Sequence, residues 1–302
     1  MDRRKFLSGT AAASAGMFLS PESILKDNIV NATGEPAHKI ITCNIRVALP
    51  EDEEKGVGWS SRKKLCADVI RSQAPDVICL QEVIKIQMDD MRSFFPEFAS
   101  FGFEGPEMDP IPVGYHWIAK NPILFSRERY ELLSGGSFWL SDQPLIGGSK
   151  SWGTARARHA NWVRLKDIES QKEFRVINTH LDHVSQDSRE MQIDRILKES
   201  EQYQQEFPQI LAGDFNADFR NPVLDIIKES GWTDTYASVH GSHYPNFTGH
   251  GFAGKESKST RGPIDYIFAR GNTKANKAQI IIDTDEGRYP SDHFFVSAEV
   301  EV

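Results

Sequence analysis

Five apolar, strand-like runs of this chain each end in polar or ionisable residues, and no other feature restricts the fold as strongly. Runs of this composition are typical of buried strands, where an ionisable group is costly unless it is paired or metal-bound. The five ends carry Asn44, Glu82, His180-Leu181-Asp182-His183, Asp214-Phe215-Asn216 and Asp292-His293. We expect these ends to converge on one edge of a sheet and to form a functional site there.

Strands and helices are predicted along the whole chain from residue 39 onwards. Amphipathic or charge-rich patterns predict helices at residues 60–73, 86–95, 185–203 and 221–230. Apolar runs predict strands at residues 39–45, 76–83, 121–126, 130–140, 157–166, 173–182, 209–215, 262–269, 278–283 and 293–302. Mixed strands with helices in two clusters predict two packed sheets flanked by helices.

The chain of 302 residues contains no Pro/Gly/Ser-rich linker and no internal repeat, so we expect a single domain over residues 31–302. Its formal net charge is −8 at pH 7. Proteins that bind nucleic acid through phosphate neutralisation are usually basic, so this charge argues against tight, nonspecific DNA binding.

The three cysteines are too few for a disulfide framework. Cys43 and Cys79 lie in predicted strands and Cys66 lies in a predicted helix, so all three are expected to be buried as small hydrophobic side chains. A bridge between Cys43 and Cys79 on neighbouring strands is the alternative that the sequence leaves open.

The N-terminus begins Asp2-Arg3-Arg4-Lys5 and continues into a mildly apolar stretch of small residues. This pattern resembles a twin-arginine export signal, so we assign residues 1–30 to a signal segment and expect an exported protein, periplasmic or extracellular. The apolar stretch is too short to anchor the chain stably in a bilayer. The alternative interpretation is a basic start to a cytosolic protein.

Three short motifs follow one another in the second half of the chain. They are Gly213-Asp214-Phe215-Asn216, Ile264-Asp265-Tyr266 and Ser291-Asp292-His293. In this order and strand context they resemble the endonuclease/exonuclease/phosphatase superfamily of metal-dependent phosphoesterases, and the similarity runs from about residue 39 to the C-terminus. The resemblance implies an α/β fold, a four-layer α/β/β/α sandwich of two packed mixed sheets flanked by helices, with the site at one mouth between the sheets.

The resemblance and the residue types together predict a divalent-metal site. Carboxylate oxygens are the hard ligands that Mg²⁺ prefers, and the principal metal ligand of the family corresponds to Glu82. Asn44 is expected to place an amide oxygen near the same ion or on the phosphate, and Asp292 to ligate this ion or a second one. The expected cofactor is Mg²⁺ or Mn²⁺, as one or two ions.

Asp214 and Asn216 are two residues apart, so both side chains face the same side of an extended backbone. The resemblance implies that Asp214 is the base that activates water and that Asn216 holds a phosphate oxygen. His180 and His293 are candidates for contacting non-bridging oxygens or for protonating the leaving group, and Asp265 is the expected orienting partner of His293. An Asx turn after a strand is the alternative explanation of Asp214.

Further polar residues near these motifs are candidate substrate contacts. Arginine suits bidentate phosphate binding, so Arg158 is a candidate, although an exposed basic turn is the commoner explanation. Asp182 faces the same side as His180 and is a candidate to orient it, whereas His183 faces the other side and is either a substrate contact or structural. His250 lies in a glycine-rich loop that either sets substrate choice or is simply solvated.

The leading hypothesis is a divalent-metal-dependent phosphoesterase, more specifically a phosphodiesterase, that directs water in line onto phosphorus. Its partner is expected to be a phosphoester substrate, either a small molecule, a lipid headgroup or a nucleic acid. We expect a monomer without stable membrane insertion. The alternative from another class is a catalytically silent, exported binding module of the same fold.

Replacing both Arg3 and Arg4 with lysine should trap the protein in the cytosol, because the twin-arginine route reads the pair itself and not only its charge. The measurement is the distribution of the protein between cytosolic and extracytoplasmic fractions for the wild type and the variant. Wild-type protein found in the cytosol with residues 1–30 intact would contradict the export hypothesis.

Overall fold

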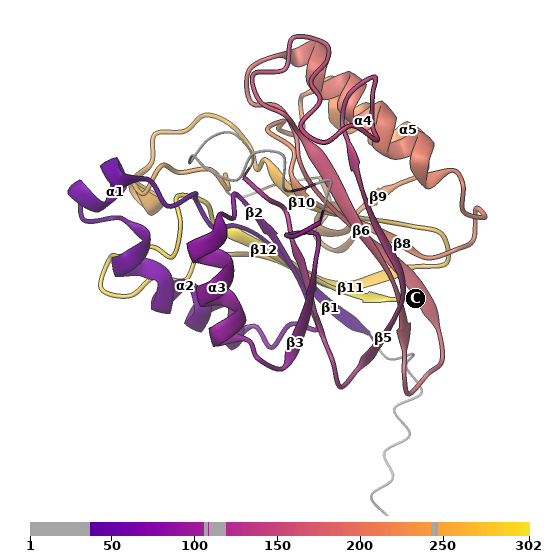
Figure 1. Cartoon of the computed structure of the whole chain (residues 1–302), viewed down its shortest axis with the longest axis horizontal. Coiled ribbons are helices and arrows are strands. Elements are labelled where there is room, and N and C mark those ends of the chain that lie inside the picture. The colour runs from indigo at the N-terminus through magenta and orange to yellow at the C-terminus, as the bar shows by residue number, and fades with distance from the viewer. Residues whose placement is uncertain (1–36, 106–107, 109–118, 243, 245–246) are drawn as a thin grey trace, which may run out of the picture. The chain divides into compact units, whose positions relative to one another are not determined.

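The apolar runs form two six-stranded mixed sheets within the part of the chain that the structure describes (Figure 1). The computed structural model describes residues 37–105, 108, 119–242, 244 and 247–302, and the predicted signal segment lies outside these ranges. The first sheet has the order β11-β12-β1-β2-β4-β3 and comprises β1 (His38–Asn44), β2 (Val77–Gln81), β3 (Phe98–Phe101), β4 (Ile123–Ser126), β11 (Lys274–Ile281) and β12 (Phe295–Glu301). The second has the order β5-β6-β7-β8-β10-β9 and comprises β5 (Tyr130–Trp139), β6 (His159–Asp167), β7 (Glu173–His180), β8 (Gln209–Asp214), β9 (Thr233–Asp234) and β10 (Asp265–Arg270).

Helices lie on the two sides of the pair of sheets. α1, α2 and α3 lie on the side of the first sheet, and α4 and α5 lie on the side of the second (Figure 1). The helices are α1 (Pro50–Glu54), α2 (Trp59–Ser72), α3 (Lys85–Phe94), α4 (Gln186–Ser200), α5 (Pro222–Glu229), α6 (Thr235–His240) and the short 3₁₀ helix η2 (Gly254–Glu256). In the described ranges, no helix is long and apolar enough to cross a membrane.

Three apolar clusters define the layers of the fold. One lies between the sheets and contains Ile40 from β1 and Val176 from β7. The second joins the first sheet to α2 and α3 and contains Ile41 and Met88, whereas the third joins the second sheet to α4 and α5 and contains Ile193. Neighbouring residues such as Ile40 and Ile41 enter different clusters because successive side chains of a strand point to opposite faces. The predicted α/β/β/α sandwich is confirmed.

The sequence patterns miss several short or exposed elements. They do not predict α1, α6, β3 or the two-residue β9, and they start β11 at residue 278 instead of Lys274. β11 is the edge strand of the first sheet, and much of it is exposed. An edge strand with polar residues on both faces carries no strong apolar signal, so its beginning is invisible in the hydrophobic pattern.

All three cysteines are buried and free. Cys43 lies in the cluster that covers α2 and α3, whereas Cys79 lies in the cluster between the sheets. The two side chains therefore point to opposite faces of the first sheet, which excludes the Cys43–Cys79 bridge that the sequence left open.

A polar bridge crosses the apolar layer between the sheets. Gln81 Nε2 of β2 donates a hydrogen bond of 2.7 Å to Asn178 Oδ1 of β7. Asn178 Nδ2 donates in turn to the backbone carbonyl of Leu80 at 2.8 Å. Both amide side chains are fully buried. The bridge thus ties the two sheets together next to Glu82, which follows β2, and His180, which ends β7.

Asn178→Ala should lower the free energy of unfolding by about 3 kcal/mol, because it leaves buried amide and carbonyl groups without partners. The measurement is denaturant unfolding of the wild type and the variant. Asn276→Ala is the matched control, since Asn276 makes its side-chain hydrogen bond to Glu301 on the exposed surface. Equal stabilities of the two variants would contradict a structural role for the bridge.

Candidate active site

Strand direction brings the predicted residues of the second sheet together. β7 and β8 are parallel and in register, so that their last residues, His180 and Asp214, are direct neighbours. β10 runs antiparallel to β8, and its first residue, Asp265, therefore lies opposite Asp214. The three side chains meet at one edge of the sheet although they come from separate regions of the sequence.

The first sheet presents its own polar residues at the same edge. β1 and β2 are parallel, with Asn44 beside Gln81, and Glu82 follows immediately. β12 is antiparallel to β1, so the residues that precede it arrive at the same end. Ser291 Oγ donates to the backbone carbonyl of Asn44 at 2.6 Å, which fixes the neighbouring Asp292 and His293 there.

The backbone at these strand ends is strained. Arg46, Glu82 and Asn216 have φ values of 55°, 64° and 49°, in the left-handed region that non-glycine residues rarely adopt. Gly213 precedes Asp214 with a φ of 151°, and a Cβ atom there would lie 2.1 Å from the carbonyl oxygen of Thr179. These conformations turn the functional side chains out of the strand ends, and the surrounding packing holds them.

Asn44 connects the acidic groups of the two sheets. Its Nδ2 atom donates to Glu82 Oε1 at 3.2 Å and to Asp214 Oδ2 at 3.0 Å. Its Oδ1 atom accepts from the backbone nitrogen of Arg46 at 3.0 Å. The amide nitrogen, and not the oxygen expected from the sequence, thus faces the two carboxylates.

Glu82 and Asp292 have opposite pKa shifts. Desolvation alone would raise the pKa of Glu82, but a 2.9 Å hydrogen bond from the Val47 backbone nitrogen and the positive charge of His293 lower it overall. Desolvation raises the pKa of Asp292, and the nearby Glu82 adds to this effect. Arg46 Nη1 lies 3.4 Å from Asp292 Oδ2 and partly compensates the charge.

His293 forms an ion pair with the acids of the second sheet. Its Nδ1 atom lies 2.8 Å from Asp265 Oδ2 and 4.0 Å from Asp214 Oδ2. Burial opposes the charged imidazole, but the charge and hydrogen bond of Asp265 outweigh it and hold the pKa of His293 well above its usual value. The predicted contact between Asp265 and His293 is present, and it places the proton on Nδ1.

Asp214 is the most perturbed carboxyl group of the site. Burial, followed by repulsion from Asp265, raises its pKa to about 7. Asn216 donates its backbone N–H to Asp214 Oδ1 at 2.9 Å, in the geometry of an Asx turn. The turn that the sequence offered as an alternative explanation therefore coexists with the site and orients its central carboxylate.

His180 is neutral and is oriented by Asn216. Asn216 Nδ2 donates to the carbonyl of Leu181 at 3.1 Å and lies 3.0 Å from His180 Nε2, which therefore accepts. Burial and the nearby charge of Arg158 hold the pKa of His180 well below its usual value. His180 Nε2 is also only 3.4 Å from Asp214 Oδ2, so it lies beside the candidate base.

Asp182 does not orient His180 as the sequence suggested. Its carboxylate accepts hydrogen bonds from the backbone nitrogens of Ala155, Val184 and Ser185 at 3.0, 3.0 and 2.7 Å. Asp182 therefore fastens the segment before β6 to the segment after β7. The two-residue alternation used in the prediction ends with β7 at His180, and the chain turns before Asp182.

A cavity of ≈ 190 Å³ opens between these groups. It is lined by Arg46, Val47, Leu49, Glu82, Arg156, Arg158, His180, His183, Asp214, Asn216, Asp292 and His293. Arg158 and His183, two of the candidate substrate contacts, are among them, whereas His250 is not. The Nδ1 atom of His250 instead accepts from the Gly254 backbone nitrogen at 3.1 Å, which stabilises a turn.

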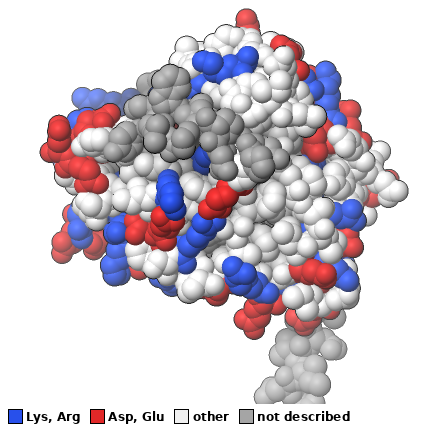
Figure 2. Space-filling model, in the orientation of Figure 1, with Lys and Arg blue, Asp and Glu red and all other residues white. Residues whose placement is uncertain are grey.

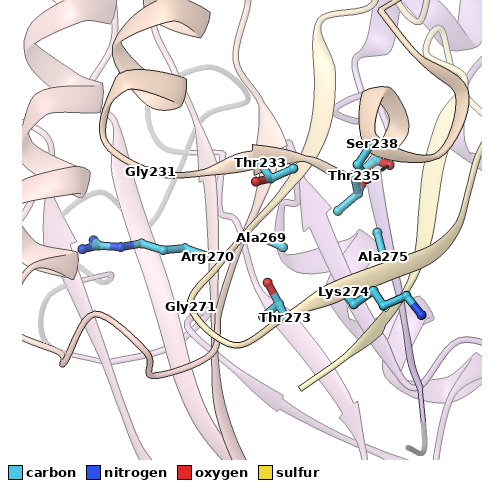
Figure 3. Close-up of a pocket in the computed structure, with 10 residues that line it drawn as sticks. All are labelled: Gly231, Thr233, Thr235, Ser238, Ala269, Arg270, Gly271, Thr273, Lys274 and Ala275. Atoms are coloured by element: carbon cyan, nitrogen blue, oxygen red, sulfur yellow. Dashed lines mark hydrogen bonds between the residues drawn. The ribbon is translucent and has the colours of Figure 1, made fainter. Parts of the chain in front are cut away.

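A larger cavity of ≈ 360 Å³ lies at the opposite end of β10, where the strand ends in Arg270. Threonine, serine and glycine dominate its lining, and the Arg270 and Lys274 side chains extend in opposite directions (Figure 3). Because no charged groups converge there, its size alone does not make it a functional site. The smaller cavity contains the acids, the imidazoles and the arginines together.

Sequence reasoning missed Arg46 and Val47. Arg46 lines the cavity and pairs with Asp52 and Asp292, and the Val47 backbone nitrogen binds Glu82. Both residues follow β1, where the sequence Ile-Arg-Val continues the apolar pattern. Their position two and three residues after Asn44 was the one signal in the sequence, and it does not reveal the left-handed turn at Arg46.

The donor set fits a hard divalent cation. Glu82 and Asp292 line the cavity with carboxylate oxygens, which Mg²⁺ and Mn²⁺ prefer. Asp214, Asp265 and His293 also present ligand atoms within 4.8 Å of one another. Since the proton on His293 Nδ1 faces both of these carboxylates, we interpret that group as a charge pair; Glu82 and Asp292 are the other carboxylates of the cavity that could hold an ion.

A family model described as the endonuclease/exonuclease/phosphatase family matches residues 41–293. The chain belongs to this family. Its members are hydrolases that act on phosphoesters and are generally metal-dependent. The matched region starts in β1 and ends at His293, so it contains every element that contributes to the cavity.

Solved bacterial structures share the whole fold. A family member from Bacteroides thetaiotaomicron superposes with a TM-score of 0.79 at 25% identity, covering 88% of this chain and 98% of that one. A mannosyl-6-phosphatase from the same organism superposes with a TM-score of 0.78 at 25% identity, covering 87% and 99%. An uncharacterized protein of Acanthamoeba polyphaga mimivirus is 28% identical over 53% of this chain, and the match spans only 28% of that longer protein.

Asp265→Asn should lower the pKa of His293, because the variant loses the negative charge that stabilises the imidazolium. The measurement is NMR titration of the histidine side chains in the metal-free protein, with the exposed His240 as internal reference. An unchanged His293 pKa in the variant would contradict the ion pair.

Proposed function

We propose that the protein is a divalent-metal-dependent phosphoester hydrolase in which water attacks phosphorus in line with the leaving oxygen. The observation that carries the proposal is the convergence of Glu82, Asp214, Asp292 and His293 on one cavity from both sheets. The metal, when bound by Glu82 and Asp292, supplies positive charge that polarises the phosphoryl group. Family membership supports the phosphoester class and a metal requirement.

The position of each side chain in the cavity indicates its role in hydrolysis. Asp214 accepts the proton of the attacking water, and the Asx turn at Asn216 keeps its carboxylate in place. Asn216 donates both hydrogens of its amide nitrogen, one to the carbonyl of Leu181 and one to His180 Nε2, so it orients His180 at the cavity wall and has no N–H left for the phosphate contact expected from the sequence. His293, held charged by Asp265, stabilises the negative charge that develops and protonates the leaving oxygen.

The surface charge supports a small substrate more than duplex DNA. On the face shown in Figure 2, basic and acidic side chains of the described residues are interspersed and form no extended basic stripe. Together with the net charge of −8, this argues against nonspecific duplex binding. We propose a small phosphoester or lipid headgroup encountered outside the cytoplasm, in keeping with the export signal that the sequence resembles.

Glu82→Gln should lower kcat/KM for aryl phosphoesters at least about 100-fold, because the variant loses a charge that holds the metal. The measurement is hydrolysis of p-nitrophenyl phosphate and of bis(p-nitrophenyl) phosphate with Mg²⁺ or Mn²⁺. Glu128→Gln is the matched control, since Glu128 is exposed and lies after the end of β4 that pairs with the start of β2, away from Glu82. Wild-type turnover by Glu82→Gln, with the fold intact, would refute the assignment.

Chelation separates an enzyme from the silent binding module. The wild-type protein should lose phosphoester hydrolysis in EDTA and regain it with excess Mg²⁺ or Mn²⁺. A silent module would bind metal, seen as a rise in thermal stability, without chelator-sensitive hydrolysis of either ester.

A further inference from the structure

Arginines on the two sides of the cavity differ in their partners. Arg46 is paired with Asp52 and Asp292. Among the described residues, no carboxylate forms an ion pair with Arg156 or Arg158, which we call the arginine pair. Both members of the arginine pair line the cavity. Their positive charge is therefore available to an anion in the cavity.

Arg158 is the member of the arginine pair that is better placed to bind an anion. Only 7% of the surface of Arg158 is accessible to solvent, and its Nε atom is buried without a hydrogen-bond partner among the described residues. Its Nη2 atom lies 3.3 Å from His183 Nδ1, and because arginine can only donate, His183 accepts and stays neutral. The charges of Glu82, Asp214 and Asp182 act on Arg158 without direct contact. A buried guanidinium with a donor left unpaired is costly, so its place in the cavity points to a negatively charged ligand.

The segment that carries the arginine pair is held in place. Asp182 accepts from the Ala155 backbone nitrogen, and the Leu140 backbone nitrogen donates to the carbonyl of Arg158 at 2.8 Å. The carboxylate oxygens of Asp182 are occupied by backbone donors, so Asp182 makes no hydrogen bond to Arg158 and acts on it only through its charge. The backbone that carries the arginine pair is thus in place before any ligand arrives, which reduces the entropy lost on binding.

We propose that Arg158, assisted by Arg156, binds the additional oxygen and charge of a terminal phosphate, so that the enzyme selects phosphomonoesters over phosphodiesters. A monoester phosphate presents three non-bridging oxygens and nearly two negative charges, whereas a diester presents two oxygens and one charge. For a diester, His293 and an ion held by Glu82 and Asp292 would serve the two non-bridging oxygens. The arginine pair supplies the donors that only the dianion requires.

This inference rests on the proposed function and keeps its chemistry. The water oxygen forms a new bond to phosphorus while the bond between phosphorus and the ester oxygen breaks. The proton of the water passes to Asp214, and the leaving oxygen takes a proton from His293. The products are an alcohol and inorganic phosphate, and the phosphodiester expected from the sequence becomes the less favoured substrate.

The kinetic test compares Arg158→Ala and Arg158→Lys with the wild type on p-nitrophenyl phosphate and bis(p-nitrophenyl) phosphate. We expect kcat/KM for the monoester to fall at least about tenfold further than that for the diester in Arg158→Ala. Arg158→Lys keeps the charge but loses the planar fork, so its kcat/KM for the monoester should lie between those of the wild type and Arg158→Ala. Arg270→Ala at the distant cavity is the control. Equal losses on both esters would overturn the inference.

A second test measures anion binding and does not depend on catalytic turnover. Calorimetry with Mg²⁺ present should show that inorganic phosphate binds the wild type more tightly than dimethyl phosphate, and that Arg158→Ala removes the difference. Phosphate binding unaffected by Arg158→Ala overturns the inference whatever the activity. Phosphate binding that requires Arg158 in a protein without chelator-sensitive hydrolysis supports the anion site and refutes the proposed function instead. Circular dichroism of each variant confirms that it is folded.

Discussion

The hydrogen bonds between Gln81 and Asn178 join the two sheets beneath the site, and the positions of the polar strand ends depend on them. Both side chains are fully buried in an otherwise apolar layer, where an amide without a partner is costly. The bridge therefore fixes β2 against β7. Glu82 and His180, which belong to different sheets, are held at one cavity as a result. A slip of either strand by one residue would break the bridge and turn these side chains away.

The cavity separates charge in a way that suits a phosphoryl group. Carboxylates gather where the strands end. Burial, followed by repulsion from Asp265, raises the pKa of Asp214, and the negative charge of Asp265 supports the charged form of His293. The arginine pair lies on the segment before β6. Asp182, which follows β7, accepts hydrogen bonds from the backbone nitrogen of Ala155 on that segment and from that of Ser185. Acids suited to a cation and guanidinium groups suited to an anion thus line the same small volume.

The sequence predicted much of the fold and of the site, and its failures share one physical cause. Buried strands and their polar ends were visible because ionisable residues rarely interrupt apolar runs without a reason. The edge strand β11, the orientation of Asn44 and the separation of Cys43 from Cys79 were not visible. Each depends on which face or which hydrogen-bond partner a residue meets, and that is set by neighbours distant in sequence. His250 failed to reach the cavity for the same reason, since a local turn engages its ring.

The amino-acid sequence by itself determined the alternation of strands and helices, the polar residues at the strand ends and the chemistry that they offer, because periodicity and residue type are local properties. Tertiary structure alone decided which charges are compensated. Arg46 forms an ion pair with Asp292, whereas the side chain of Arg158 contacts the neutral ring of His183 and, among the described residues, no carboxylate within ion-pair distance. The sequence shows three arginines of equal charge, but pairing and burial depend on distances between segments, and these distances exist only once both sheets have packed.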